Sequence, residues 1–367
     1  MKFKIIKSDF LEALNITQGV VAKKNVMAIL SNVLIEASVQ APLIQLSATD
    51  MEVAVHIQAQ AQIEKSGRIT VNAKSLYDII KESVSEEISF EVKDETGRIV
   101  ISSGHSEYNI LGLSATEYPA LPEIKGDFFR IGTEDLASMI DKVGFAMSTD
   151  ETRYHLNGVL FEKNEDGLVM VATDGHRLSF VSKDLKGLVF NQDRLILPRK
   201  GVNELRSLLS QEKSVELCFS DRHVFCKTEK QTLYIRLLDG NFPDYRRVIP
   251  EANPIQIGLP REDLIGALKR VSLLSNERSK GVTFYFCNNL LSVTSSNPEI
   301  GEAKEEIDIS YSGPILNIGF NAKYFLDVLA VIPDETVNIA FKDNTSPCVV
   351  LCESDPGFRS VVMPMRL

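Results

Sequence analysis

A pattern of apolar and polar positions typical of an α-helix occurs three times along the chain. It covers residues 72–80, 198–205 and 321–329, and in each copy a Lys is followed after two positions by an apolar residue, after four by an acid and after five by another apolar residue. Apolar residues at this spacing form one buried stripe on a helix. We therefore predict three related amphipathic helices. An Asn at the start of the first and third copies suits the N-cap, and Pro198 suits the first helical position of the second.

Two other landmarks repeat together with these helices. One is an earlier helical pattern that starts with a polar residue and an acid, and the other is a strand-like run that ends in a hydroxyl residue followed by Asp or Asn. The positions are Asp9, Asp135 and Asp263 for the first, and Thr49-Asp50, Thr173-Asp174 and Ser296-Asn297 for the second. Because three markers agree on a period of about 125 residues, the chain contains one structural unit three times.

Each unit is expected to have an α+β fold in which two helices pack on antiparallel sheets. Short runs of β-branched or alternating apolar residues, separated by turn residues, fill the sequence between the helices. Segments with prolines near 118–129 and 242–255 are the expected linkers. The predicted domains are therefore residues 1–125, 126–248 and 249–367.

Composition limits the classes of protein that fit. With 367 residues and 44% apolar residues, the chain can build a core in each domain. The net charge of −10 argues against a protein that coats nucleic acid or an anionic membrane with its whole surface, but it leaves room for a local basic face. Neither a signal-peptide pattern nor a membrane-spanning run is present, so we expect a cytoplasmic protein.

Motifs for catalysis and for cofactors are missing from the sequence. The glycine spacings exclude GxGxxG and GxSxG, a phosphate-binding loop near residues 67–75 has the wrong spacing, and neither HExxH nor an EF-hand loop occurs. The five cysteines lie in apolar strand-like runs without CxxC spacing, which favours reduced core residues over a metal or redox site. We therefore predict no catalytic site, no metal and no cofactor.

One segment, residues 173–177, combines an Asp with a His. Its Thr173-Asp174 pair recurs in the other copies, which favours a turn at a strand end. The following Gly175-His176-Arg177 occurs only in the middle copy, which favours a function specific to that copy. Three interpretations stay open at this point: a surface that binds a partner, a structural turn, and a hydrolase site built on Asp174 and His176.

The Lys of the repeated helix lies in the first turn, where the helix dipole disfavours a cation. Its three occurrences are Lys74, Lys200 and Lys323. Each could form an i,i+4 ion pair with the acid of the same helix. Alternatively, the helix starts face a polyanion, an interpretation that other basic residues nearby also favour. These are Lys7, Lys23, Lys24, Lys142, Arg153, Arg199, Arg206, Lys269 and Arg270.

The end of the sequence, Val361-Val362-Met363-Pro364-Met365, is also unusual. Methionine side chains adapt to different apolar ligands, and a proline prevents further strand pairing. The segment is therefore either part of a binding site or only the last core strand.

Several motifs together resemble those of the bacterial sliding clamp, the beta subunit of DNA polymerase III. They are Thr152-Arg153-Tyr154-His155-Leu156-Asn157-Gly158, Ala172-Thr173-Asp174-Gly175-His176-Arg177-Leu178, Phe242-Pro243-Asp244-Tyr245, Leu274-Ser275-Asn276-Glu277 and Val362-Met363-Pro364-Met365-Arg366-Leu367. The resemblance covers the whole chain. It implies three tandem DNA-clamp domains that form half of a closed ring, with a head-to-tail homodimer enclosing duplex DNA independently of its sequence. The implied function is a processivity factor without catalysis, which slides on DNA and tethers the replicative polymerase.

The resemblance also implies roles for individual residues. A pocket would bind short Gln- and Leu-rich peptide motifs. These motifs would belong to the polymerase III catalytic subunit, the clamp loader, other polymerases and repair proteins. The pocket would comprise Leu156, Thr173, Gly175, His176, Arg177, Leu178, Pro243, Arg247, Val248, Val361, Val362, Met363, Pro364, Met365 and Arg366. The residues expected to face DNA are Lys23, Lys24, Lys74, Arg153, Tyr154, Arg199, Lys200 and Lys323. The dimer interface would bring Tyr108 and Ile110 against Leu273 and Leu274.

The chain departs from the family pattern at two places. His155 stands where other members often have a Tyr, and the loop near Lys23 and Lys24 is short. These departures affect individual DNA contacts and not the expected ring. The alternative to a clamp is an interaction scaffold with a three-domain repeat that never encircles DNA.

Overall fold

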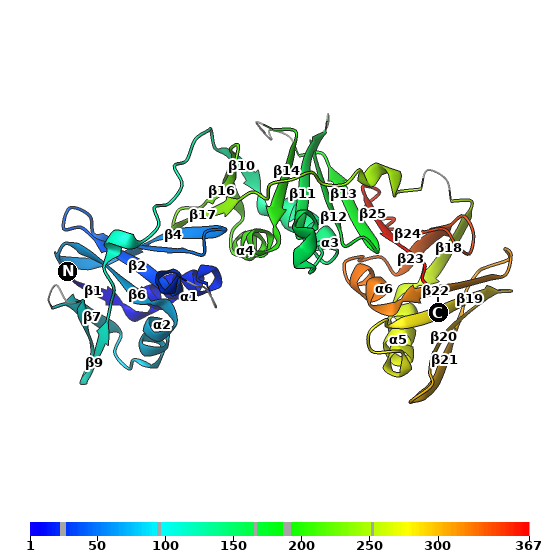
Figure 1. Cartoon of the computed structure of the whole chain (residues 1–367), viewed down its shortest axis with the longest axis horizontal. Coiled ribbons are helices and arrows are strands. Elements are labelled where there is room, and N and C mark those ends of the chain that lie inside the picture. Colours follow the sequence, from blue (N-terminus) through cyan, green and yellow to red (C-terminus); the bar gives the residue numbers. More distant parts are fainter. Residues whose placement is uncertain (23–26, 94–96, 165–166, 186–191, 251–252, 367) are drawn as a thin grey trace. The chain divides into compact units, whose positions relative to one another are not determined.

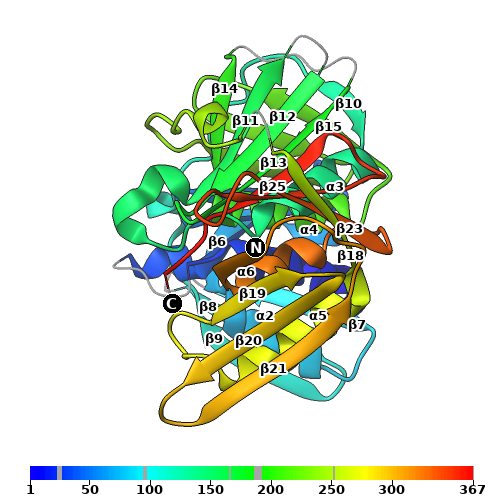
Figure 2. The same ribbon diagram turned by 90° about the vertical axis from the view of Figure 1, so that its right-hand side faces the viewer.

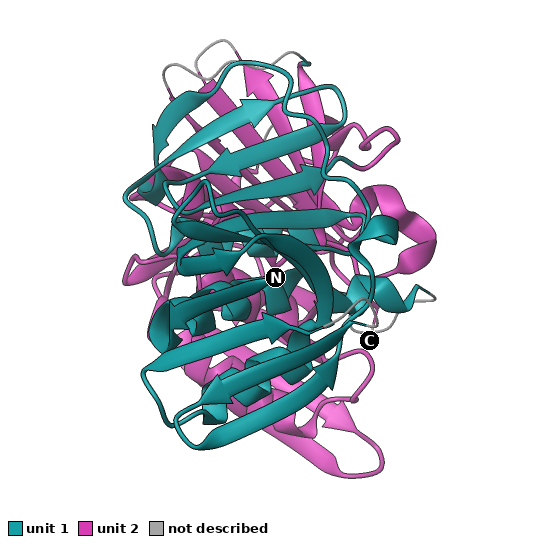
Figure 3. Cartoon of the chain, turned by 90° about the vertical axis from the view of Figure 1, so that its left-hand side faces the viewer, with its two compact units in different colours: residues 1–134, 189–192, 200–237 teal, residues 135–188, 193–199, 238–367 magenta. Residues whose placement is uncertain are grey.

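The computed structural model describes residues 1–22, 27–93, 97–164, 167–185, 192–250 and 253–366. Lys23 and Lys24, two of the residues expected to face DNA, lie outside the described residues. Contacts divide the chain into two compact units, shown in different colours in Figure 3. Unit 1 comprises residues 1–134, 189–192 and 200–237, and unit 2 comprises residues 135–188, 193–199 and 238–367. The predicted boundaries of the three repeats stay predictions.

The same order of elements occurs in all three repeats: strand, helix, four strands, helix, three strands, with one extra short strand in the first. The first repeat contains β1 (Lys2–Ile6), α1 (Lys7–Val20), η1 (Ala28–Ser31), β2 (Asn32–Ala37), β3 (Leu43–Thr49), β4 (Val53–Gln60), β5 (Gln62–Lys65), β6 (Gly67–Asn72), α2 (Ala73–Glu82), β7 (Glu87–Val92), β8 (Arg98–Ser103), β9 (Ser106–Leu111) and η2 (Ala115–Glu117).

The second repeat contains β10 (Phe129–Gly132), α3 (Thr133–Gly144), η3 (Glu151–Leu156), β11 (Gly158–Asn164), β12 (Gly167–Thr173), β13 (Arg177–Lys183), β14 (Arg194–Pro198), α4 (Arg199–Leu209), β15 (Ser214–Phe219), β16 (His223–Lys227), β17 (Gln231–Arg236) and η4 (Tyr245–Arg247). The third contains β18 (Ile255–Pro260), α5 (Arg261–Val271), η5 (Ser272–Leu274), β19 (Gly281–Cys287), β20 (Leu290–Asn297), β21 (Gly301–Asp308), β22 (Leu316–Asn321), α6 (Ala322–Leu329), β23 (Thr336–Phe341), β24 (Cys348–Leu351) and β25 (Phe358–Val362). This order confirms the predicted threefold α+β repeat.

Two antiparallel sheets form the framework of unit 1. One has the strand order β5-β1-β7-β8-β9, and the other has the order β10-β15-β16-β17-β4-β3-β2-β6. In the second sheet, β17 of the middle repeat pairs with β4 of the first repeat, with Ile235 opposite Val53. Hydrogen bonds of one continuous sheet therefore join the first repeat to the middle one.

Unit 2 is built in the same way. Its sheets have the orders β14-β11-β12-β13-β25-β24-β23-β18 and β21-β20-β19-β22. Here β13 of the middle repeat pairs with β25 of the third, with Arg177 opposite Val362. Figure 2 shows β19, β20 and β21 side by side in front of helices α5 and α6. The two junctions between repeats thus use the same strand pairing.

The cores explain why the apolar stripes of the helices recur. In the first repeat, α1 and α2 pack against each other (Figure 1), and the rings of Phe3 and Phe90 stack at 4.9 Å between centroids. In the third, Phe325 of α6 lies 5.0 Å from the rings of both Phe284 and Phe320. Each of these rings is fully buried. Packing of the apolar helix face against the core provides most of the stabilisation of such helices, and buried aromatic rings contribute strongly to such a core.

Polar residues start the repeated helices as the sequence predicts. Asn72 accepts a hydrogen bond from the Ser75 amide at 2.9 Å, and Asn321 accepts one from the Lys323 amide, also at 2.9 Å. Pro198 ends β14 directly before α4, one position earlier than predicted. The described helices include none that is both long and apolar enough to cross a membrane.

Candidate functional site

The segment from Thr173 to Arg177 is a hydrogen-bonded turn between β12 and β13. The Thr173 hydroxyl donates to the Arg177 carbonyl at 2.6 Å and accepts from the Gly175 amide at 3.0 Å. One carboxylate oxygen of Asp174 accepts from the amides of His176 and Arg177 at 2.9 and 3.0 Å. Gly175 has φ +88°, a conformation that glycine adopts without strain. The other carboxylate oxygen of Asp174 binds the Arg177 guanidinium, so the partners of this carboxylate are those of a structural turn.

Arg177, the last residue of this turn, is buried, with only 8% of its surface exposed. Its guanidinium binds Asp174 at 3.1 Å, Asp327 of α6 at 2.7 Å and the Phe145 carbonyl at 2.6 Å. It also lies 4.6 Å from the Tyr324 ring centroid and 5.4 Å from that of Phe145. A buried cation needs such partners to offset its lost hydration. Arg177 thereby fixes α6 of the third repeat against the turn of the middle repeat.

Several predicted pocket residues form an apolar floor beside the turn. Leu178 and Val361 lie opposite each other on β13 and β25. Both belong, with Leu156 of η3, to one buried cluster that also includes Tyr245. Burial and the neighbouring Glu162 carboxylate raise the pKa of Tyr245 to about 12. The structure thus brings together residues from four separate segments, η3, β13, η4 and β25.

The last residues of the chain form hydrogen bonds with both the middle repeat and the third repeat. Beyond the buried end of β25, the Met363 amide donates to the His176 carbonyl at 3.0 Å. The Met365 amide then donates to the Gly319 carbonyl of β22 at 2.8 Å. Met363 is 39% exposed, and Pro364 is half-buried. Val361 and Val362 are therefore core strand residues, whereas Met363 is exposed beside His176 and is followed by half-buried Pro364 and Met365.

The linker part of the predicted pocket lies on and beside η4. Pro243, Arg247 and Val248 are exposed there. The Arg247 guanidinium forms an ion pair with Asp244 at 2.9 Å, and the Val248 amide donates to the Tyr245 carbonyl at 3.0 Å. These residues are connected to the apolar floor through Tyr245, which is buried in the cluster.

Phe145 and Tyr324 belong to the site although they are absent from the predicted set. Both rings enclose the Arg177 guanidinium. A signal for Tyr324 does exist, because it occupies the position of Ser75 and Gly201 in the other copies of the repeated helix. The aromatic residue therefore occurs only in the copy whose helix contacts Arg177.

The basic residues expected to face DNA have different surroundings. Lys200 is paired with Asp50 and donates to the Val20 carbonyl at 2.6 Å, and Arg199 donates to the carbonyls of Met147 and Ser148 at 2.6 and 2.7 Å. Both side chains are half-buried. These contacts give Lys200 and Arg199 a structural role.

The other basic positions are more accessible. Lys74 is exposed and has no ion-pair partner among the described residues. The Lys323 side chain is 64% exposed and forms the predicted i,i+4 pair with Asp327 at 2.7 Å. Arg153 pairs with Asp150 at 3.0 Å, and the neighbouring Tyr154 is 54% exposed. The alternative of an i,i+4 pair is therefore realised at Lys323.

The residues predicted for a dimer interface lie near open sheet edges. Tyr108 and Ile110 are alternate, half-buried residues of β9, which is the edge strand of its sheet. Leu273 in η5 is 77% exposed, and Leu274 is half-buried. An edge strand offers unpaired backbone groups to another chain.

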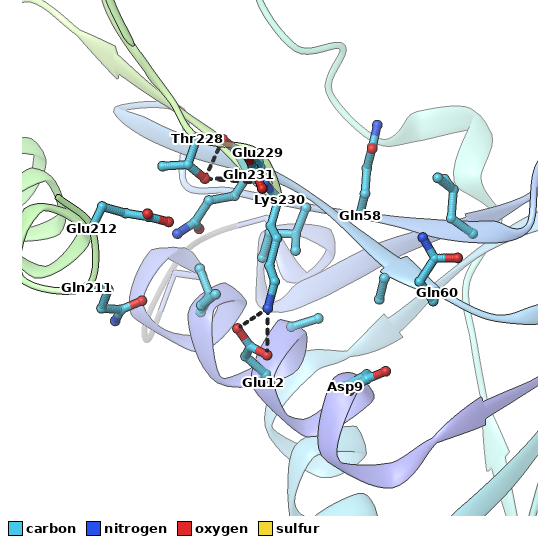
Figure 4. Close-up of a pocket in the computed structure, with 15 residues that line it drawn as sticks. Asp9, Glu12, Gln58, Gln60, Gln211, Glu212, Thr228, Glu229, Lys230 and Gln231 are labelled. Carbon is cyan, nitrogen blue, oxygen red and sulfur yellow. Dashed lines mark hydrogen bonds and ion pairs between the residues drawn. The ribbon is translucent and has the colours of Figure 1, made fainter. Parts of the chain in front are cut away.

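A cavity of about 400 Å³ in unit 1 lies between α1 and the ends of β4 and β17 (Figure 4). Its labelled side chains are all polar, and Lys230 binds both carboxylate oxygens of Glu12 at 3.0 and 3.2 Å. This pair connects the β16–β17 hairpin to α1, and none of the predicted site residues lines the cavity.

Comparison with known proteins gives a consistent family. Three models match: the N-terminal, central and C-terminal domains of the DNA polymerase III beta subunit, over residues 1–122, 130–244 and 246–366. The chain is 37% identical to a beta sliding clamp from Pseudomonas aeruginosa and 35% identical to one from Caulobacter vibrioides, in each case over the full length of both chains.

Solved structures agree with this result. The crystal structure of the P. aeruginosa DNA polymerase III subunit beta has a TM-score of 0.93 at 35% identity, with complete coverage of both chains. A sliding clamp from Bartonella birtlesii bound to griselimycin has a TM-score of 0.95 at 34% identity, again with complete coverage. The chain, with its three tandem clamp domains, therefore belongs to the family of bacterial beta sliding clamps, the beta subunits of DNA polymerase III.

Proposed function

We propose that the protein is a processivity factor of DNA replication, which encircles duplex DNA as a homodimer and tethers the replicative polymerase. The observation that carries this proposal is the match of all three domains to the DNA polymerase III beta subunit. The proposed domains are residues 1–125, 126–248 and 249–367. The protein acts without a catalytic site of its own and works in the cytoplasm.

Sliding requires weak contacts with DNA. Phosphates attract Lys and Arg without reading the base sequence, and the attraction is sensitive to salt. Lys74, Lys323, Arg153 and Tyr154 are the accessible members of the proposed DNA-facing set. Since the chain has a net charge of −10, its remaining surface repels DNA. Retention then depends on the closed ring and not on tight binding.

The proposed dimer is head-to-tail, so each interface joins two different surfaces. Tyr108 and Ile110 on β9 would meet Leu273 and Leu274 of the other copy. The open edges at β9 and β21 support this arrangement, because antiparallel pairing of two edges satisfies their backbone groups. Glu305 of β21 is already paired with Arg270 at 2.9 Å. Glu302 and Glu299, which are exposed, are better placed to meet a cation of the partner.

The proposed peptide site comprises the turn with His176, the floor of Leu156, Leu178 and Val361, and the tail from Met363 to Arg366. An apolar floor with a few polar groups at its rim suits a short peptide with a Gln and a Leu. Such peptides would come from the polymerase, the clamp loader and repair proteins. Among the similar structures, a Caulobacter crescentus clamp has polyethylene glycol bound to a proposed beta-motif tethering region.

Primer extension tests the tethering function. The assay combines the protein with the polymerase III catalytic subunit and the clamp loader from the same organism. The conditions allow only one polymerase binding event on each template. We expect much longer products with the protein than without it. Met363→Ala should shorten the products, because it removes an exposed apolar side chain of the proposed peptide site. Equal product lengths with and without the protein would contradict the proposed function.

A further inference from the structure

The turn that carries the proposed peptide site has a counterpart in unit 1, at the junction of the first and middle repeats. The Thr49 hydroxyl donates to the Val53 carbonyl at 3.0 Å and accepts from the Met51 amide at 3.0 Å. One carboxylate oxygen of Asp50 accepts from the amides of Glu52 and Val53 at 3.0 and 2.8 Å. These are the same bonds, atom for atom, as those of the turn from Thr173 to Arg177.

The strand that follows is also equivalent. The Arg236 amide donates to the Glu52 carbonyl at 2.8 Å, as the Met363 amide donates to the His176 carbonyl. Together with the pairing of Val53 with Ile235, this sets a residue-by-residue correspondence between the two junctions. Glu52 and Ala54 occupy the positions equivalent to His176 and Leu178. Tyr234 and Arg236 occupy the positions equivalent to Val361 and Met363. In the linkers, Pro119 follows the buried Tyr118 in the same way as Pro243 follows the buried Phe242.

A pocket of about 280 Å³ lies at this counterpart junction. Its apolar part includes Val53, Ala54 and Tyr234, which are buried. The linker residues from Pro119 to Pro122 form another wall. The pocket therefore has the two structural components of the proposed peptide site, a strand-end turn with an apolar floor and a proline-bearing linker.

The charges of this pocket differ from those of the proposed peptide site. Arg222, His223 and Arg236 line it, against the single carboxylate of Glu52. Both arginines are exposed and form no ion pair with a described residue. Burial lowers the pKa of His223, and the positive charges of Arg236 and Arg222 lower it further. Two unpaired guanidinium groups at the rim of an apolar pocket can bind a carboxylate through charge-assisted hydrogen bonds.

We propose that this pocket is a second peptide-binding site, which takes a segment of a partner protein that has an acidic residue next to apolar ones. The carboxylate would bind Arg222 and Arg236, and the apolar side chains would cover Ala54 and Tyr234. The Glu52 carboxylate and the apolar floor favour a peptide over a run of nucleic-acid phosphates. Because the second site has Arg236 at the position where the first has the apolar Met363, the second site selects a different class of peptide segment.

Binding of a defined peptide tests this inference on the full-length protein. The probe is a fluorescent, acetylated and amidated peptide with the core Asp-Leu-Phe, and its analogue carries Asn-Leu-Phe. Anisotropy titrations are combined with NMR spectra of the histidine rings, in which the His223 signal is identified by its loss in His223→Gln. We expect the Asp peptide to bind and shift this signal, and the Asn analogue to bind at least about tenfold more weakly, since it cannot form the charged hydrogen bond.

Variants separate this site from general electrostatic attraction. Arg222→Ala and Arg236→Ala should each weaken binding of the Asp peptide about tenfold or more, whereas Arg68→Ala, which removes an exposed arginine of β6, should leave it unchanged. Unchanged thermal unfolding shows that the variants fold. Equal affinity of the two peptides, equal loss with Arg68→Ala, or full competition by inorganic phosphate or single-stranded DNA would overturn the inference. It does not depend on encirclement of DNA, so it can fail while the clamp function holds.

Discussion

The side chains of Arg177 and Asp327 form an ion pair at 2.7 Å although they are 150 positions apart in the sequence. Arg177 belongs to the turn of the proposed peptide site, and Asp327 belongs to the repeated helix of the third repeat. Asp327 also binds Lys323. One carboxylate thus connects the repeated helix to a turn whose Arg occurs only in the middle repeat.

Loss of this pair should destabilise unit 2. Asp327→Ala leaves the Arg177 guanidinium buried with fewer partners, which costs about 2–4 kcal/mol in the free energy of unfolding. Lys323→Ala removes only an exposed partner and should cost less than about 0.5 kcal/mol. Denaturant unfolding of both variants measures the difference. Similar costs for the two substitutions would show that the buried geometry does not stabilise the protein.

Removal of an accessible or a structural lysine should have different consequences. Lys74→Ala should leave the midpoint of thermal unfolding unchanged and should reduce the salt dependence of DNA binding, with a slope smaller by about 0.9 for each phosphate that Lys74 neutralises in the wild type. Lys200→Ala should instead lower the midpoint, since the Asp50 carboxylate loses its cation. Binding to short duplex DNA at several salt concentrations, with Arg68→Ala as control, measures the slopes. An unchanged slope for Lys74→Ala would remove Lys74 from the DNA-facing set.

Alkaline pH should weaken the apolar floor through Tyr245. The pKa of Tyr245 is raised in the folded protein from 10.0 to about 12. The folded state therefore favours the neutral phenol, and this stabilisation is complete below pH 10 and is lost as the pH rises toward about 12. Unfolding free energies measured between pH 9 and 11 should fall more steeply for the wild type than for Tyr245→Phe. Parallel curves would mean that Tyr245 titrates normally in the fold.

The proposed dimer makes a prediction about mass in solution. Leu273→Asp combined with Leu274→Asp places two charges in an apolar contact, so we expect monomers in sedimentation velocity where the wild type gives dimers. Val39→Asp, at an exposed apolar residue of the β2–β3 turn, serves as control and should stay dimeric. Dimers of the double variant would place the contact elsewhere.

Sequence reasoning found the threefold repeat because its markers are local. Helix caps, apolar spacing and strand ends depend on near neighbours, and the hydrogen bonds of Asn72 and Asn321 confirm the predicted N-caps. Ionic partners depend on tertiary structure. Three lysines at equivalent positions have three different surroundings: Lys74 is unpaired among the described residues, Lys200 binds Asp50, and Lys323 binds Asp327.

The composition of the site was predictable only in part. The unusual Gly-His-Arg of the middle repeat and the Met-Pro-Met tail could be recognised from the sequence, and the Met363 amide does reach the His176 carbonyl. The enclosure of Arg177 by Phe145 and Tyr324 could not be predicted, because it depends on how the third repeat packs against the middle one. The neighbouring positions of Arg222 and Arg236, which form no ion pair with a described residue, could not be predicted either, because they follow from the strand register that places His223 opposite Arg236.

Retention on DNA of different topology tests the central claim most directly. The protein is loaded onto nicked circular DNA by the clamp loader, washed at a salt concentration that removes ordinary electrostatic binding, and the DNA is then cut once with a restriction enzyme. If the protein encircles the duplex, it stays on the circle through the wash and leaves the linear molecule over its free ends. Equal loss from circular and linear DNA, or equal retention on both, would contradict encirclement.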